Sequence, residues 1–275
     1  MIGATLTAYR WELRKLAAQK RTWLGIATAA LAPVVFLISI QISKVTPHDG
    51  PWDTPLGPNL RHSGLAIDLV TLKLVAVIGP AIVVALVAGD IVAGEDMAGT
   101  LKTILTRALA RGHVLAGKTL ALFSYVIAAL VAYGALGLLV GIAAWGFHPL
   151  TNLSGDRISA LQTLALTFPA IGVFALPVVA IASFGLFLSV LTRHSVAGVA
   201  GTLLYALALQ GLSALTPIAG ARPYLLVNQF NAWHDLFQTP IAGDAIDQSL
   251  WVSALWTAPP LLAAWIIFRS RDVAT

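Results

Sequence analysis

The chain has 275 residues, of which 58% are hydrophobic and 11% are charged, and its formal net charge is +5. Soluble domains carry about 25% charged residues, so this composition excludes an ordinary soluble fold and indicates a protein of the lipid bilayer. The sequence contains no cysteine, which excludes disulfides, zinc–thiolate sites and iron–sulfur clusters.

Residues 1–23 are basic and precede an apolar run too long for the core of a signal peptide. The apolar residues that share one face at helical spacing are Leu6, Tyr9, Leu13, Leu16 and Ala17. We therefore expect an amphipathic helix that lies on the membrane surface. The alternative is a basic flank that only sets orientation.

Six apolar runs reach the length needed to cross a bilayer, about 20 residues at 1.5 Å each. They are residues 24–43, 69–93, 119–147, 160–191, 196–216 and 250–268. The sequence thus predicts an all-α membrane protein with six transmembrane helices in one domain, residues 1–275.

Prolines and glycines mark special places in these runs. We expect Pro33 to kink the first helix, and Pro169 and Pro177 to interrupt the fourth. Gly137 and Gly141 form a small-xxx-small pair that allows close helix approach, although this signal is weak in so apolar a helix.

Three connections lie on one side of the membrane. Residues 44–68 form a polar, proline-rich loop, and residues 148–158 a short one. Residues 217–248 mix aromatic and polar side chains, which suits short interfacial segments.

Twelve of the seventeen Lys and Arg residues fall in the N-terminal segment, the 94–118 linker, the 192–195 turn and the tail. The positive-inside rule therefore puts both termini and this linker in the cytoplasm. Membrane orientation explains the basic charge, so no nucleic-acid partner is needed.

The linker itself is patterned as a short amphipathic helix over residues 94–112. Acidic Glu95 precedes basic Arg107 and Arg111, the order that the helix dipole favours, and Gly112 is a plausible C-terminal stop. A solvated linker that happens to be helical is an equally good interpretation of the periodicity alone.

Asp90, at the inner end of the second run, is expected at the membrane interface, or else paired with Lys118 or Arg107 in gating. A phosphate-binding loop is absent, because Gly94 and Gly99 are followed by Thr100-Leu101 rather than Lys and a hydroxyl residue. Hydrolase motifs and clustered histidines are also absent. We expect no catalytic residues, no metal site and no cofactor in this chain.

The segment GDIVAGEDMAGTLKTILTRALARGHVLAGK, residues 89–118, resembles the permeases of ABC exporters of the type 2 family. Residues 9–15 look like the surface "elbow" helix of that family, and residues 268–273 like its usual ending. Only the 89–118 segment is specific at residue level, and Ala108 stands where many members carry proline.

The resemblance implies a half-transporter in the cytoplasmic membrane of a prokaryote, with both termini in the cytoplasm. Two permeases would pair, as a homodimer or a related heterodimer, and two copies of a separate ATPase subunit would bind ATP and magnesium. The 94–112 segment would be the coupling helix that docks on the ATPase, and residues 217–248 would hold re-entrant helices. The coupling residues implied are Glu95, Gly99, Thr100, Leu101, Thr103, Leu105, Arg107 and Arg111.

The expected function is ATP-driven export of a hydrophobic or amphipathic substrate such as a drug, peptide or lipid-like molecule. The chain itself would be a transport subunit and not an enzyme. A secondary transporter is the first alternative, disfavoured because no internal repeat is evident and the centres of the apolar runs lack carboxylates. A membrane scaffold without an ATPase is the second.

Overall fold

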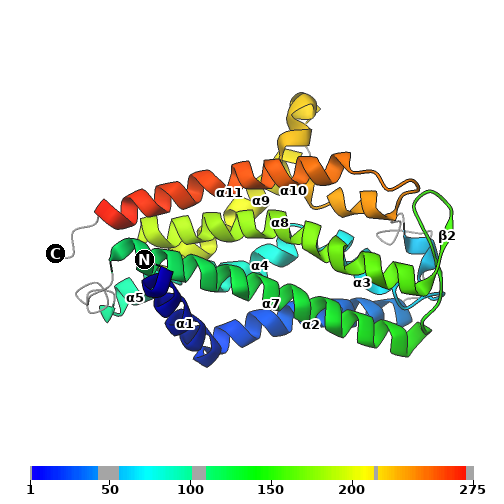
Figure 1. Cartoon of the computed structure of the whole chain (residues 1–275), viewed down its shortest axis with the longest axis horizontal. Helices are drawn as coiled ribbons and strands as arrows, with labels where there is room; N and C mark the ends of the chain where they lie inside the picture. Colours follow the sequence, from blue (N-terminus) through cyan, green and yellow to red (C-terminus); the bar gives the residue numbers. More distant parts are fainter. Residues whose placement is uncertain (1, 43–55, 101–109, 214–215, 271–275) are drawn as a thin grey trace.

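The computed structural model describes residues 2–42, 56–100, 110–213 and 216–270 as a bundle of long helices that run along its longest axis (Figure 1). Within these residues six helices are long and apolar enough to cross a membrane, so the chain is a multi-pass membrane protein. The start of α1 (Ile2–Ala18) and the end of α11 (Asp244–Ser270) lie at the same end of the bundle as α5 (Ala93–Met97), and this end is called the termini end (Figure 1). The opposite end, which carries a β-hairpin, is called the hairpin end.

The helices and strands follow one another along the chain. They are α1 (Ile2–Ala18), α2 (Lys20–Ile42), η1 (Gly57–Asn59), α3 (Ala66–Val75), α4 (Ile78–Ala88), α5 (Ala93–Met97), α7 (Arg111–Trp145), β1 (Leu150–Thr151), β2 (Arg157–Ile158), α8 (Ala160–Thr192), α9 (Ser195–Ser213), η2 (Thr216–Tyr224), α10 (Leu226–Gln229), η3 (Ala232–Phe237) and α11 (Asp244–Ser270).

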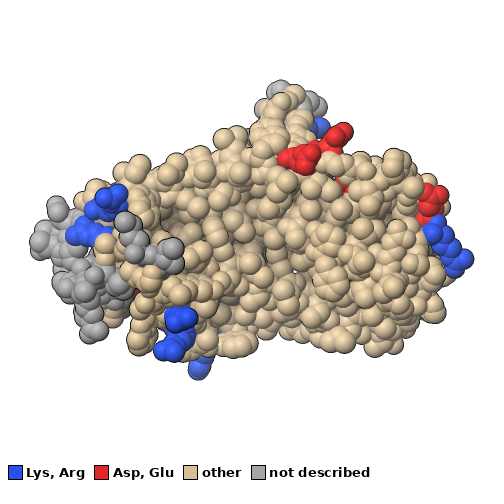
Figure 2. Space-filling model, viewed as in Figure 1, with Lys and Arg blue, Asp and Glu red and all other residues tan. Residues whose placement is uncertain are grey.

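Charged side chains follow this axis. On the face drawn in Figure 2, a broad uncharged band separates the basic side chains near the termini end from the charges toward the hairpin end. Such a band is what a helix bundle presents to the hydrocarbon of a bilayer.

The second predicted helix, residues 69–93, is not continuous. The structure divides it into α3 and α4 with a break at Ala76–Val77, where Val77 has a φ of +70°. Pro80 supplies the physical reason, because its ring would clash with the carbonyl of residue 76, and it cannot donate the corresponding hydrogen bond. The residues long enough to cross a membrane here are Ile78–Met97.

The fourth predicted helix differs in the opposite way, because the structure shows a continuous helix where interruptions were expected. α8 runs unbroken from Ala160 to Thr192 with Pro169 and Pro177 inside it. A proline costs the helix one hydrogen bond, whereas unwinding it in hydrocarbon would leave several backbone groups without partners. The helix therefore continues through both prolines.

The small-xxx-small pair of α7 does permit close approach. A Cβ on Gly137 would lie 2.7 Å from Asp68 Cγ of α3 and 3.0 Å from Pro33 Cβ of α2. A Cβ on Gly64, just before α3, would lie 2.6 Å from the backbone nitrogen of Ile142, directly after Gly141. These glycines let the start of α3 lie against α7 backbone to backbone.

The N-terminal helix α1 packs on α7 rather than standing alone. Its buried stripe is Ala8, Glu12 and Leu16, whereas Leu6 is 42% exposed and Ala17 is also exposed. Leu6 and Ala17, near the two ends of the predicted apolar face, thus remain exposed, and α1 turns the Glu12 carboxylate toward the bundle. The hydroxyls of Tyr9 and Ser124 lie 2.8 Å apart and hold α1 along α7.

The hairpin end is more ordered than the predicted loops. Within residues 148–158, β1 and β2 pair antiparallel, with Leu150 opposite Ile158. Within residues 217–248, short helical segments bury Trp233, Phe230 and Phe237, and Phe230 meets Phe174 of α8 edge to face at 5.1 Å. Residues 44–55 of the predicted 44–68 loop lie outside the described residues.

Candidate functional site

The candidate site is the connection between α4 and α7 at the termini end, together with the side chains that hold it. The structure describes this connection through Thr100 and again from Ala110. Four of the predicted coupling residues, Leu101, Thr103, Leu105 and Arg107, lie outside the described residues.

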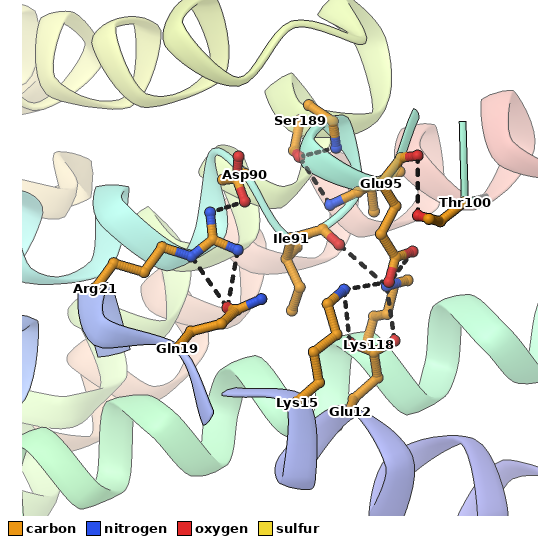
Figure 3. A network of polar contacts seen from close by, with 12 residues as sticks. Glu12, Lys15, Gln19, Arg21, Asp90, Ile91, Glu95, Thr100, Lys118 and Ser189 are labelled. Carbon is orange, nitrogen blue, oxygen red and sulfur yellow. Dashed lines mark hydrogen bonds and ion pairs between the residues drawn. The ribbon is translucent and has the colours of Figure 1, made fainter. Parts of the chain in front are cut away.

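Lys118 is the centre of the site. It lies two turns inside α7 and is fully buried. Its Nζ donates to Glu12 Oε1 of α1 at 2.7 Å and to the Ile91 carbonyl at 3.0 Å, and it lies 2.7 Å from Glu95 Oε2 of α5 (Figure 3). One ammonium group thus joins three elements that are far apart in sequence.

Lys15 is the second cation of this cluster. Its Nζ contacts Glu95 Oε1 and lies 3.8 Å from Glu12 Oε2 (Figure 3). Two cations and two carboxylates balance, which buried charges require if they are to remain ionised. We call Glu12, Lys15, Glu95 and Lys118 the ion cluster.

Asp90 does not pair with Lys118, contrary to one prediction from the sequence. Its carboxylate instead binds the Arg21 guanidinium and accepts a hydrogen bond from the Ser195 hydroxyl. Arg21 also donates from Nε and Nη2 to Gln19 Oε1, at 3.1 and 2.9 Å (Figure 3). The predicted alternative partner Arg107 lies outside the described residues. Asp90 therefore ties α4 to the start of α2 and the start of α9.

Ser189 of α8 holds the backbone just before α5. Its fully buried Oγ accepts hydrogen bonds from the Val92 and Ala93 backbone nitrogens, at 3.1 and 2.9 Å. Those two N–H groups begin α5, where helix donors have no partner within the helix. Ser189 thus links the connection to α8, a fifth helix after α1, α7, α2 and α9.

Replacing this acceptor should weaken the whole termini end. We expect Ser189→Ala to lower the free energy of unfolding by about 1–3 kcal/mol, because it leaves two buried N–H groups without an acceptor. Denaturant titration in detergent micelles measures this. The control is Ser39→Ala, which removes a hydroxyl that donates to the Val35 carbonyl of its own helix and should change stability by much less. Equal losses in the two variants would contradict the proposed role of Ser189.

The outer side of the connection has a different character. Met97 is 57% exposed, and Ala98, Gly99 and Thr100 are exposed beside it. Gly99 ends the turn with a φ of +68°, and nothing lies within 4 Å of where its Cβ would be. This left-handed conformation is the usual stop after a helix. The Thr100 hydroxyl donates to the Glu95 carbonyl at 3.3 Å.

The predicted helix over 94–112 is not one helix within the described residues. α5 ends at Met97, and Gly112 lies in the first turn of α7 instead of ending a helix. A Cβ on Gly112 would lie 2.7 Å from the Trp265 ring, so this glycine serves the packing of α7 on α11. Arg111 Nη1 donates to the Arg269 carbonyl of α11 at 3.1 Å, which places Arg111 away from the ion cluster.

The sequence prediction missed Glu12, Lys15, Arg21, Ser189 and Ser195 as members of the site. Glu12 carried a usable signal, since it lies four residues from both Ala8 and Leu16 and so shares their stripe. Lys15 and Arg21 belong to a run of basic residues and carried none.

The described residues hold no group of three His, Cys, Asp or Glu side chains that could bind a metal ion. The site is instead a set of paired charges and hydrogen bonds at one end of a membrane helix bundle. Because the site connects an exposed turn to five helices, a displacement of the turn would act on those helices.

These features define the class of the protein as a multi-pass α-helical membrane protein. The connection between α4 and α7 is held in place by ion pairs and hydrogen bonds, and we call it the clamped connection. A family model described as "Protein of unknown function (DUF2705)" matches residues 55–274, most of the chain. The chain belongs to this family. No curated protein shows a significant match to the sequence. The matched residues include Glu95 and Lys118 but not α1 or α2.

Proposed function

We propose that the chain is the membrane-spanning permease subunit of an ATP-driven ABC exporter in the cytoplasmic membrane of a prokaryote. Two permeases would pair, two copies of a separate ATPase subunit would bind at the termini end, and that end would face the cytoplasm. The observation that carries the proposal is the clamped connection: its outer turn is exposed at Met97 while Glu95 behind it is buried in the ion cluster.

This arrangement suits a coupling element. If the ATPase displaced the exposed turn 97–100, the displacement would be passed to α1 and α7 through the ion cluster and to α8 through Ser189. Rigid helices linked by paired charges carry displacement between distant sites when the linked elements have two arrangements. In this proposal Glu95 does not touch the ATPase, and its function is to fix the turn that does.

Nucleotide chemistry is assigned to the partner. The connection lacks the Lys and hydroxyl residue of a phosphate-binding loop after Gly99, so ATP and magnesium would bind the ATPase subunit. We propose that the substrate is hydrophobic or amphipathic, in keeping with an apolar cavity of about 110 Å³ that lies among α2, α3, α4, α7 and α8. A small apolar group about the size of benzene would fill such a volume.

One observation favours a second candidate, a proton-linked secondary transporter. Asp68 of α3, which lies outside the six helices long enough to cross a membrane, is a buried carboxylic acid that packs against Gly137 of α7. Acidic side chains at membrane depth are typical of proton pathways. Transport that follows a proton gradient without any ATPase would favour this candidate.

Glu95→Gln tests the coupling proposal. We expect the complex with the ATPase encoded beside this chain to assemble but to lose transport per ATP by roughly 5- to 150-fold, the range of a coupling free energy of about 1–3 kcal/mol. The reason is that the amide keeps the size of Glu95 but leaves Lys15 without its closest carboxylate.

Substrate flux and ATP hydrolysis in vesicles measure this ratio. Asp156→Asn, an exposed substitution in the hairpin loop, is the matched control and should leave the ratio unchanged. An unchanged ratio in Glu95→Gln would remove Glu95 from the coupling route.

A further inference from the structure

Asp68 is an acidic residue that the ion cluster and the proposed coupling route do not use. It lies in the first turn of α3 and is only 1% exposed. Among the described residues, neither Oδ1 nor Oδ2 has a hydrogen-bond partner. Buried carboxylates are normally paired, so this one requires an explanation.

The side chain lies at membrane depth. It faces Gly137 of α7, eight residues before Trp145 at the helix end, which is about 12 Å along the axis at 1.5 Å per residue. Pro33, near the middle of α2, lies beside the same point of α7, 3.0 Å from where a Cβ on Gly137 would be. Asp68 therefore lies inside the helix bundle, nearer its hairpin end, while α7 itself is longer than the roughly 30 Å of hydrocarbon.

No positive charge faces this carboxyl from the described elements packed around it. Tyr133 of α7 is the titratable group beside it, and its hydroxyl donates to the Asp68 backbone carbonyl at 2.6 Å, not to the carboxyl. Lys73 of α3 is bound to Asn231 at 2.7 Å. The basic residues of α2 within its described range, Lys20 and Arg21, lie at the far end of that helix, and α4 and η1 carry no titratable side chain.

A metal ion or an amine would need room and further oxygen ligands at the carboxyl. Instead, Gly137 lies against it, and the apolar cavity lined by Leu72 and Tyr133 does not include Asp68 in its wall. A proton requires no space and makes the group neutral, which removes the cost of burying a charge.

We propose that Asp68 is a proton-binding site within the membrane part of the bundle. Its carboxyl is protonated while α3 packs on α2 and α7. When α3 moves away from α7 and water reaches the group, the O–H bond breaks, the electron pair stays on the carboxylate and the proton passes to water. This inference goes beyond the proposed exporter function and does not depend on an ATPase partner.

The first test uses the full chain in lipid nanodiscs with ¹³C-labelled aspartate side chains. We expect one carboxyl resonance of a protonated aspartate at neutral pH, which is lost in Asp68→Asn and kept in the control Asp156→Asn. Absence of a protonated aspartate, or its persistence in Asp68→Asn, would overturn the proposal.

If Asp68→Asn fails to fold, Gly137→Ala serves as the second variant. Its methyl group must displace the carboxyl, because a Cβ there would lie 2.7 Å from Asp68 Cγ. The protonated resonance should then shift or vanish, while Gly172→Ala, with nothing within 4 Å of its Cβ position, should leave it in place. An unmoved resonance in Gly137→Ala would contradict the assignment.

Release of the proton has its own readout. Hydrogen exchange of the α3 amides should rise from neutral to alkaline pH by more than the intrinsic rate in the native chain, because ionisation favours the wetted arrangement. Asp68→Asn should remove this excess. Equal pH dependence in the two chains would show that separation of α3 does not involve Asp68. Both measurements use the chain alone, so their failure would leave the ATPase proposal standing.

Discussion

Lys118→Met should lower the free energy of unfolding by about 3–5 kcal/mol, the usual loss when one partner of a buried ion pair is removed. Lys118 is fully buried, and its ammonium group contacts Glu12, Glu95 and the Ile91 carbonyl at the same time. Its removal leaves Lys15 alone to balance two carboxylates. Denaturant titration in detergent micelles, followed by tryptophan fluorescence, measures the loss.

Two further variants serve as comparisons for this measurement. Lys20→Met removes an exposed lysine of α2 and should stay within about 0.5 kcal/mol of the native chain. The double variant Lys118→Met with Glu95→Gln restores charge balance, because Lys15 and Glu12 remain. It should lose less than the two single losses added together. If Lys118→Met were no worse than Lys20→Met, the ion cluster would not hold the termini end together.

Gly141→Ala should have the second largest effect, a loss of about 1–3 kcal/mol from overpacking. The new methyl would lie 3.1 Å from the Gly64 carbonyl carbon and closer to its oxygen, and 3.2 Å from Ile67 Cδ1. The neighbour is backbone and cannot rotate away, so α3 must move off α7. Thermal unfolding in lipid nanodiscs measures the effect.

Gly172→Ala is the matched control for Gly141→Ala. It adds the same methyl group to a helix where nothing lies within 4 Å. Because alanine is the better helix former by about 1 kcal/mol, this control should be neutral or slightly stabilising. A stable Gly141→Ala would mean that α3 does not need its close contact with α7.

The long helices could be predicted from the sequence because a span of hydrocarbon requires an uninterrupted apolar run. The six predicted runs each overlap a helix that is long and apolar enough to cross. Their ends were less well predicted, since α7 begins at Arg111 and α11 at Asp244, both before the apolar run starts. Polar residues can continue a helix beyond the membrane, so the end of an apolar run does not mark the end of the helix.

The effects of proline could not be predicted from its position alone. Pro80 accompanies a break and Pro169 does not, although both lie in apolar runs. What differs is the surrounding structure, because the break before Pro80 leaves two short helices, α3 and α4, each packed on neighbours. The hydrophobic pattern of a segment describes that segment alone and does not show which neighbouring helices will stabilise it.

The candidate site shows the same limit. The sequence prediction named Glu95, Asp90 and Lys118, and the structure buries all three, yet the predicted Asp90–Lys118 pair does not form. The partners that form come from helices earlier in the chain: Glu12 lies 106 residues before Lys118, and Arg21 lies 69 residues before Asp90. Such pairings depend on how helices are arranged, and no spacing in a single sequence contains that information.

Cross-linking from the exposed turn tests the exporter account most directly. The chain has no cysteine, so Met97→Cys provides a single thiol on the turn, and Gly155→Cys, an exposed position at the hairpin end, provides the matched control. With the neighbouring ATPase co-expressed, the account predicts a thiol cross-link to the ATPase from position 97 and none from position 155. Its yield should change between nucleotide-free and ATP-bound complexes. No cross-link from position 97, in membranes where transport still proceeds, would contradict the account.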